Sequence, residues 1–156
     1  KRMIKLASPI LCTRNYAWLG EAYYFWADEL DAINWGHTSK KKTGFFEIYK
    51  ANVECEKVLD TVFNEEHYMF WMRQIEKAAK HISKKTGIKA TIKEINQYFK
   101  EKARWDEVVT GIMFQDLPIS DDLLVKDLYY RKRIQLAVYK LEIISNFAFH
   151  LEMNCN

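Results

Sequence analysis

The spacing of hydrophobic residues changes along the chain, and each spacing predicts a type of secondary structure. Continuous apolar runs, or apolar residues at every second position, indicate strands, because successive strand side chains point to opposite faces. This pattern predicts strands at 22–26, 45–53, 108–114, 131–139 and 147–151. The nearly continuous apolar run at 108–114 is typical of a central strand that is buried on both faces.

Two longer stretches repeat apolar residues every three or four positions, which is the spacing of one helix face. The first covers 64–84 with Asn64 as its N-cap, and the second covers 91–103. Thr91 and Glu94 have the spacing of a capping box. The residues that we expect to face the core are Tyr68, Trp71, Ile75, Ala78, Ile82, Ile92, Ile95, Tyr98, Phe99 and Ala103.

Polar segments separate these elements. We expect a loop at 38–44, a turn at Leu59–Asp60 and a long connection at 115–130. The aspartates of that connection are Asp116, Asp121, Asp122 and Asp127. Their spacing matches no calcium-binding loop, so we expect solvated carboxylates and no metal site.

Composition favours a single folded domain over residues 1–156, of mixed α+β class. Hydrophobic residues make up 49% of the chain and aromatic residues 15%, which argues against disorder. The three cysteines, Cys12, Cys55 and Cys155, form no Cys-x-x-Cys pair, which argues against a disulfide framework or a structural zinc site. We expect a cytoplasmic protein without a membrane span, because no apolar run approaches the roughly 20 residues that a span requires.

The net charge of +3 is too small to indicate a nucleic-acid partner by itself. Positive charge is concentrated in two places, however. One face of the predicted helix at 64–84 carries Arg73, Lys77, Lys80 and Lys84, and the strand at 131–139 begins with Arg131, Lys132 and Arg133. The helix face could follow a phosphate backbone, or it could be an ordinary solvated face, which is the commoner case.

The most distinctive stretch is 18–35, WLGEAYYFWADELDAINW. Gly20 forms a corner before the strand at 22–26. Asp28 then offers its side-chain oxygen to the free amides of a short helix, which we expect to end at Gly36. The unit is therefore a corner, a strand and a capped helix.

Four residues of this unit have a distinctive joint spacing: Gly20, Tyr24, Phe25 and Trp35. That spacing resembles the second conserved block of the ADP-ribosyltransferase fold, in its poly-ADP-ribose-polymerase-like and diphtheria-toxin-like branch. There a Gly-x-Gly-Ile-Tyr-Phe strand precedes a helix with an aromatic residue eleven positions after the Tyr. Ala22 replaces the second Gly here. The resemblance implies an α+β, ADP-ribosyltransferase-like split β-sandwich with flanking helices.

The resemblance also implies roles for these residues. Gly20, Tyr24 and Trp35 would bind NAD, with the nicotinamide ring between Tyr24 and Trp35. Aromatic faces carry negative potential and suit a planar cation. Aromatic pairs at this spacing also occur simply as core packing.

A later strand of that family begins with a Glu, in a pattern such as Glu-Tyr-Ile-Val-Tyr, and 135–139 is the best match here. Gln135 falls at the catalytic position. A Glu there would hydrogen-bond the ribose and stabilise the positive charge that builds as the nicotinamide bond breaks, whereas a Gln brings only a dipole. Gln135 therefore favours transfer of a single ADP-ribose, and it leaves open an inactive protein or an ordinary polar strand residue.

The first block of the family is a His-Gly pair on an earlier strand, and no His precedes His37 in this chain. Either this first NAD-binding block lies upstream of Lys1 or the protein lacks it. We expect the first of these two.

The resemblance implies a NAD-dependent mono-ADP-ribosyltransferase of the short bacterial toxin or phage-defence type, with NAD as substrate and no metal. The basic residues favour RNA over DNA or protein as the acceptor. A toxin would also have an antitoxin partner, for which the helix at 64–84 and the connection at 115–130 are candidate contact surfaces.

Two other interpretations remain. The first is an ADP-ribosyltransferase-like binding module for nucleic acid or protein, without turnover. The second is an unrelated α+β domain that binds nucleic acid through its lysines and has no affinity for NAD.

Overall fold

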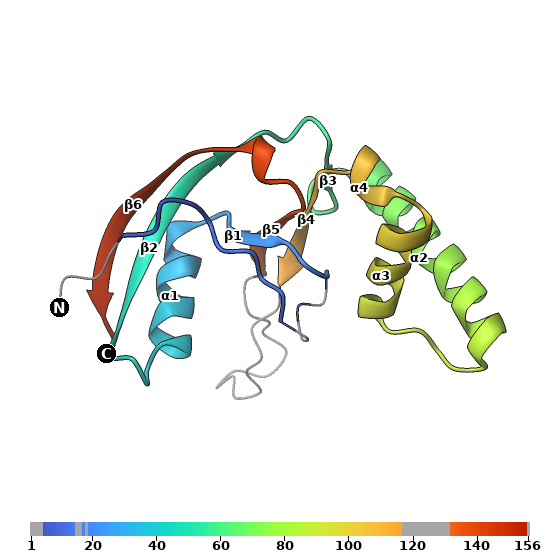
Figure 1. The fold of residues 1–156 in the computed structure, drawn as a ribbon, viewed down its shortest axis with the longest axis horizontal. Helices are drawn as coiled ribbons and strands as arrows, with labels where there is room; N and C mark the ends of the chain where they lie inside the picture. Colours follow the sequence, from blue (N-terminus) through green and yellow to red (C-terminus); the bar gives the residue numbers. More distant parts are fainter. Residues whose placement is uncertain (1–4, 15–16, 18, 117–131, 156) are drawn as a thin grey trace.

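The computed structural model describes residues 5–14, 17, 19–116 and 132–155, and its strands form two sheets (Figure 1). The strands are β1 (Tyr23–Trp26), β2 (Phe45–Val53), β3 (Val58–Asp60), β4 (Gly111–Asp116), β5 (Arg133–Val138) and β6 (Ile144–Asn154). One sheet has the order β1–β5–β4–β3, and the other pairs β2 with β6. Of the strand pairs in the described ranges, β3–β4 is parallel and the others are antiparallel.

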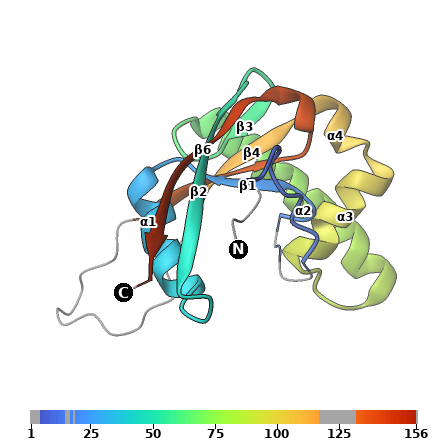
Figure 2. The ribbon, with the colours of Figure 1, turned by 60° about the vertical axis from the view of Figure 1, so that its left-hand side comes forward.

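The helices flank these sheets at opposite ends. They are α1 (Glu29–Ser39), α2 (Glu65–Thr86), α3 (Ile92–Lys102), α4 (Trp105–Val108) and the 3₁₀ turn η1 (Leu141–Ile143). Figures 1 and 2 show α1 beside β2, and α2 with α3 at the far end of the four-stranded sheet, beyond β3. Helices and strands thus give the mixed α+β class that the sequence predicts. In the described ranges, no helix combines the length and the apolar character that crossing a bilayer requires.

The helix caps agree with the sequence. Asn64 caps α2, because its side-chain oxygen accepts a hydrogen bond from the His67 backbone N–H at 3.1 Å. Gly87 ends this helix in the left-handed conformation. At the start of α3, Thr91 and Glu94 form both bonds of the capping box. The hydrogen bonds from Thr91 hold the pKa of Glu94 below its usual range.

The end of α1 differs from the prediction. Asp28 caps the helix as expected, with its carboxylate 2.8 Å from the Leu30 backbone nitrogen. The helix nevertheless continues past Gly36 to Ser39. The absence of a side chain at Gly36 serves close packing, because a Cβ there would lie 2.5 Å from ring atoms of Phe46. The glycine lets α1 lie directly on β2, and it does not end the helix.

Three other element predictions were wrong. Leu59–Asp60 is part of β3, because it pairs with β4. The predicted central strand begins only at Gly111, and Val108, in α4, is 70% exposed. The final strand runs over Ile144–Asn154, because β2 pairs with it along its length.

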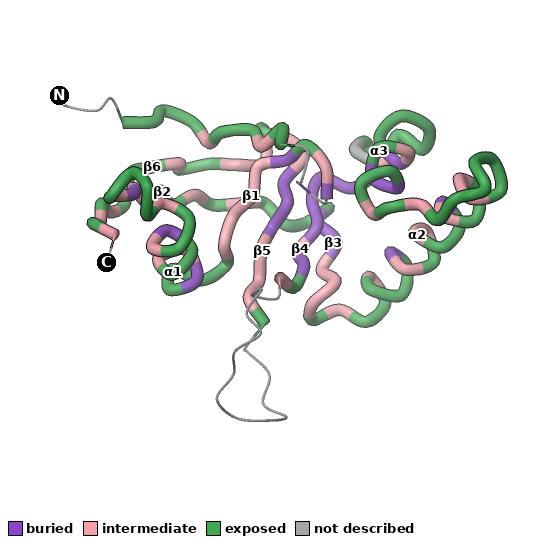
Figure 3. Tube along the Cα trace, turned by 90° about the horizontal axis from the view of Figure 1, so that it is seen from below, coloured by how far each residue is buried: buried purple, intermediate pink, exposed green. Residues whose placement is uncertain are grey.

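The main core lies between the four-stranded sheet and the helices. Figure 3 shows buried residues concentrated in β3, β4 and β5. The buried cluster consists of Leu19, Ala22, Leu59, Trp71, Val109, Ile112, Phe114 and Ala137. Trp71 and Ala78 of α2 are buried as predicted, whereas Tyr68 is 42% exposed. Similarly, Ile95 and Phe99 of α3 are buried, and Ala103 after its end is exposed.

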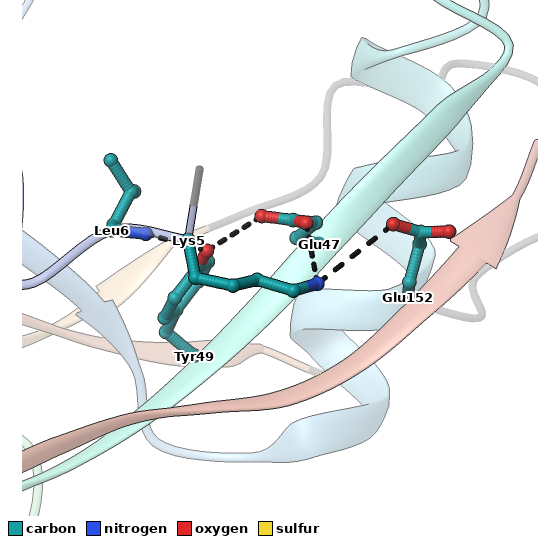
Figure 4. A network of polar contacts seen from close by, with 5 residues as sticks. All are labelled: Lys5, Leu6, Glu47, Tyr49 and Glu152. Carbon is teal, nitrogen blue, oxygen red and sulfur yellow. Dashed lines mark hydrogen bonds and ion pairs between the residues drawn. The ribbon is translucent and has the colours of Figure 1, made fainter. Parts of the chain in front are cut away.

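The segment before β1 is tied to the β2–β6 sheet by one polar network (Figure 4). Lys5 Nζ lies 2.7 Å from Glu47 Oε1 and 3.3 Å from the centroid of the Phe149 ring. The Tyr49 hydroxyl donates to Glu47 at 2.6 Å and accepts from the Leu6 backbone N–H at 3.0 Å. This set is called the Lys5 network below.

Candidate functional site

The pairing of β1 with β5 decides which of the predicted site residues share a face. In this antiparallel register Tyr24 lies opposite Ala137, and Trp26 lies opposite Gln135. Opposed residues point to the same side of a sheet, and so do residues two positions apart on one strand. Tyr24 and Gln135 therefore lie diagonally across one face, although they come from opposite ends of the chain.

Tyr24 is held by two contacts. Its hydroxyl donates to the Gly20 carbonyl oxygen at 2.8 Å, and its ring meets the Phe114 ring edge-on with 6.4 Å between centroids. Burial raises the pKa of Tyr24 well above its usual value, so the hydroxyl stays protonated at neutral pH. Tyr24 therefore packs against the core cluster on this face, and its hydroxyl is neutral.

Gln135 belongs to a compact polar cluster at the other end of the same face, called the Gln135 cluster below. Arg133 Nη2 lies 2.6 Å from Asp116 Oδ2, and Gln135 Nε2 donates to the same oxygen at 3.4 Å. The Arg133 guanidinium carbon lies 4.7 Å from the centroid of the Trp26 ring. The side chains of Arg133 and Asp116 are 20% and 27% exposed. Nε of Arg133 is buried and has no hydrogen-bond partner among the described residues.

The sequence did not predict this cluster, and the structure differs from two of the expectations above. Asp116 was expected to be a solvated carboxylate, but it is half-buried and bound to Arg133. The sequence groups Arg133 with neighbouring basic residues that could bind nucleic acid, but its charge is paired with Asp116 within the protein. Arg131, Asp121, Asp122 and Asp127 lie outside the described residues. The only available signal was the i, i+2 spacing of Arg133 and Gln135, which puts both on one face.

Trp35 lies apart from this face's aromatic residues. It sits on α1 and is 39% exposed, and the Lys40 ammonium lies 6.0 Å from its ring centroid. In the part of the chain that the structure describes, its ring makes no contact with Tyr24, whose ring partner is Phe114. The structure thus brings Tyr24 and Gln135 to one face, while Trp35 does not stack against Tyr24.

Gly20 lines a pocket of about 280 Å³ at the opposite end of the sheet from Gln135. Its walls are formed by the segment before β1, by α3, by Trp105 of α4 and by Tyr139, which directly follows β5. Its charged residues are Arg14, Glu21, Lys93 and Lys100, and Lys100 is paired with Glu21 at 3.1 Å. Its lining thus includes three cationic side chains and one anionic side chain. The sequence did not predict the pocket, because residues from four separate segments meet there.

Within the described ranges, no three His, Cys, Asp or Glu side chains lie together as a metal site would require. Burial raises the pKa of the Cys55 thiol, which lies off this face. The groups that the face itself presents are a phenol, an amide, a guanidinium and a carboxylate.

No family model matched the chain, and neither the curated proteins nor the solved structures gave a match. A function for this face therefore has to follow from its residues and their geometry.

Proposed function

We propose that the protein is a NAD-dependent mono-ADP-ribosyltransferase with an ADP-ribosyltransferase-like split β-sandwich fold, and that the β1–β5 face is its active face. One observation carries this proposal. Tyr24 and Gln135, the two residues that the resemblance selects independently, share one face of two adjacent strands. The division of the strands into a four-stranded and a two-stranded sheet supports the same fold.

The chemistry assigned to this face is the transfer of ADP-ribose from NAD. The bond between ribose C1′ and the nicotinamide nitrogen breaks, and its electron pair leaves with neutral nicotinamide. The acceptor's lone pair forms the new bond to C1′, and the acceptor's proton passes to solvent. Tyr24 binds the nicotinamide ring, and Gln135 accepts a hydrogen bond from the ribose, where positive charge develops.

The Gly20 pocket supports a ligand as long as a dinucleotide. Tyr139 lines this pocket and follows Gln135 by four positions along the chain, which at about 3.3 Å per residue is about 13 Å. Arg14 and Lys93 place positive charge at the pocket end, where the phosphates of NAD would lie. The reactive end of NAD would lie between Tyr24 and Gln135.

An RNA acceptor, in preference to DNA or protein, is part of the proposal. The basic residues of α2 are Arg73, Lys77, Lys80 and Lys84, and all four are exposed. None of the four forms an ion pair with another residue of the described ranges. Such a stripe can follow a phosphate backbone, and binding through it would weaken as salt rises. An RNA-modifying toxin or defence effector in the cytoplasm, held by an antitoxin, is the role that we infer.

A second candidate function is a binding module of the same fold without turnover. It is favoured by Tyr24, whose ring is packed against Phe114 and whose hydroxyl is bound to Gly20. The exposed position of Trp35, away from Tyr24, favours it as well.

The test is to incubate the protein with NAD labelled in its adenylate part and with total cell extract, followed by nuclease or protease digestion. We expect label on macromolecules, removed by ribonuclease. Tyr24→Leu and Gln135→Met should lower the label at least tenfold, because the first removes the ring that binds nicotinamide and the second removes the hydrogen-bond acceptor for the ribose.

Two matched controls are available on the opposite face of the same sheet. Tyr23 neighbours Tyr24 on β1, and Gln115 lies on β4 opposite Ile134. Tyr23→Leu and Gln115→Met should keep full activity. A folded wild-type protein that neither labels a macromolecule nor consumes NAD would refute the transferase and leave the binding module.

A further inference from the structure

We propose that Asp116 is a positioning residue for the transfer reaction: it fixes and polarises the Gln135 amide. This inference rests on the proposed function. The need for such a residue is chemical. An amide is symmetric in shape, and it can present either its oxygen or its NH₂ group to a ligand. Only the amide oxygen can accept a hydrogen bond from a ribose hydroxyl and stabilise positive charge on the sugar.

The contact with Asp116 removes this ambiguity. An ionised carboxylate only accepts hydrogen bonds, so the amide atom that faces Asp116 Oδ2 has to be the Nε2 donor. The oxygen of the Gln135 amide is then directed away from Asp116. Because hydrogen bonds in series polarise one another, a carboxylate behind the NH₂ group makes the amide oxygen a stronger acceptor. The pair thus restores part of the negative charge that a Gln lacks.

Asp116 is itself held in place. Arg133 is its direct partner across β4 and β5, and the ion pair of 2.6 Å shares the oxygen that faces Gln135. The guanidinium group lies over the Trp26 ring, which limits its movement. The donors of two residues therefore converge on one oxygen. This leaves Asp116 little freedom to turn away from the amide.

A double-mutant cycle separates positioning from a structural role. The variants are Asp116→Asn, Gln135→Glu and the double variant, each assayed for kcat and KM with NAD. In the wild-type background, Asp116→Asn should lower kcat about tenfold with little change in KM, because the amide loses the negative charge that polarises it and residues of one hydrogen-bond network are energetically coupled. In the Gln135→Glu background the same change should cost nothing or raise kcat, because a carboxylate needs no orienting and Asp116→Asn removes the repulsion between two neighbouring carboxylates.

Glu47→Gln is the matched control, because it replaces an ion-paired carboxylate on the other sheet, in the Lys5 network. It should leave kcat unchanged, and thermal unfolding should show that all variants are folded. An active wild type with the same loss from Asp116→Asn in both backgrounds, or with no loss in either, would overturn the inference alone. A folded wild type without NAD turnover would overturn the proposed function, and the inference with it.

Discussion

Each of the two sheets of this protein carries an ion pair next to an aromatic ring. The two ion pairs differ in how far the neighbouring ring is buried. In the four-stranded sheet, Arg133 and Asp116 join neighbouring strands, next to the buried Phe114. In the β2–β6 sheet, Lys5 reaches Glu47 from a segment outside the sheet and lies over Phe149, which is 41% exposed. The ion-pair distances are nearly equal, at 2.6 and 2.7 Å.

Equal distances do not give equal roles. Figure 3 shows buried residues in β4 and β5, whereas β2 and β6 are mostly intermediate or exposed. Arg133 and Asp116 lie at the intermediate ends of their strands, with side chains 20% and 27% exposed, and Lys5 is 46% exposed. An ion pair in a drier setting is stronger and less screened by salt. Removing one partner of such an ion pair also costs more stability, because the other charge is left buried without a partner. The Gln135 cluster therefore holds its polar groups in fixed positions within one sheet, whereas the Lys5 network fastens a separate segment to the other sheet.

The largest expected effect comes from the aromatic residues of the two sheets. Phe114 is 2% exposed, so Phe114→Ala should lower the free energy of unfolding by about 3–5 kcal/mol through lost burial and a cavity. Phe149→Ala should cost less than about 1 kcal/mol, since half-exposed side chains contribute little. Urea denaturation of both variants measures the difference. Similar losses would show that the two sheets do not differ as described, and Phe114→Leu provides a milder variant if Phe114→Ala does not fold.

The sequence predicted what depends on neighbours along the chain. Asn64, Thr91 and Glu94 bond to backbone groups within three residues, so their spacing alone defines the caps. The alternation at 45–53 likewise predicted β2 with its bounds. The mixed fold class followed from such local signals.

Features that depend on distant residues were not predictable in this way. Position 36 needs a glycine because the Phe46 ring lies where a side chain would be. The two residues meet only when α1 folds onto β2. Asp116 looked like a loop carboxylate, because its partner Arg133 is remote in sequence. For the site, the sequence offered Tyr24 and Gln135 separately, and the strand register was needed to put them on one face.

The second prediction compares the cations of the two ion pairs. Arg133→Met leaves Asp116 half-buried without its partner, and we expect a loss of about 2 kcal/mol, between the values for exposed and buried pairs. Lys5→Met should have a smaller effect, because Lys5 is 46% exposed and the Tyr49 hydroxyl still donates a hydrogen bond to Glu47 when Lys5 is replaced. Chemical denaturation at low and high salt tests this. A larger loss for Lys5→Met than for Arg133→Met would contradict the comparison.

The smallest expected effect is the dependence of the Lys5 network on pH. Hydrogen bonds from Lys5 and Tyr49 hold the pKa of Glu47 below its usual range. A carboxyl whose pKa is lower in the folded state stabilises the fold above its unfolded pKa of about 4.3. That contribution is lost as pH falls through the folded pKa. Wild type should therefore exceed Glu47→Gln in stability by a constant amount near neutral pH.

The difference between wild type and Glu47→Gln should then shrink as the solution is acidified below about pH 4.3. Denaturation curves of both proteins at several pH values measure it. Tyr49→Phe serves as the control: it removes one of the two main donors to Glu47 and keeps the other, Lys5, so it should narrow the pH-dependent difference without abolishing it. A gap that stays constant down to the acid limit would show that the charge of Glu47 does not fasten the segment before β1. The hydrogen bond from the Leu6 backbone N–H to the Tyr49 hydroxyl and the contact of Lys5 with the Phe149 ring would then hold that segment on the sheet.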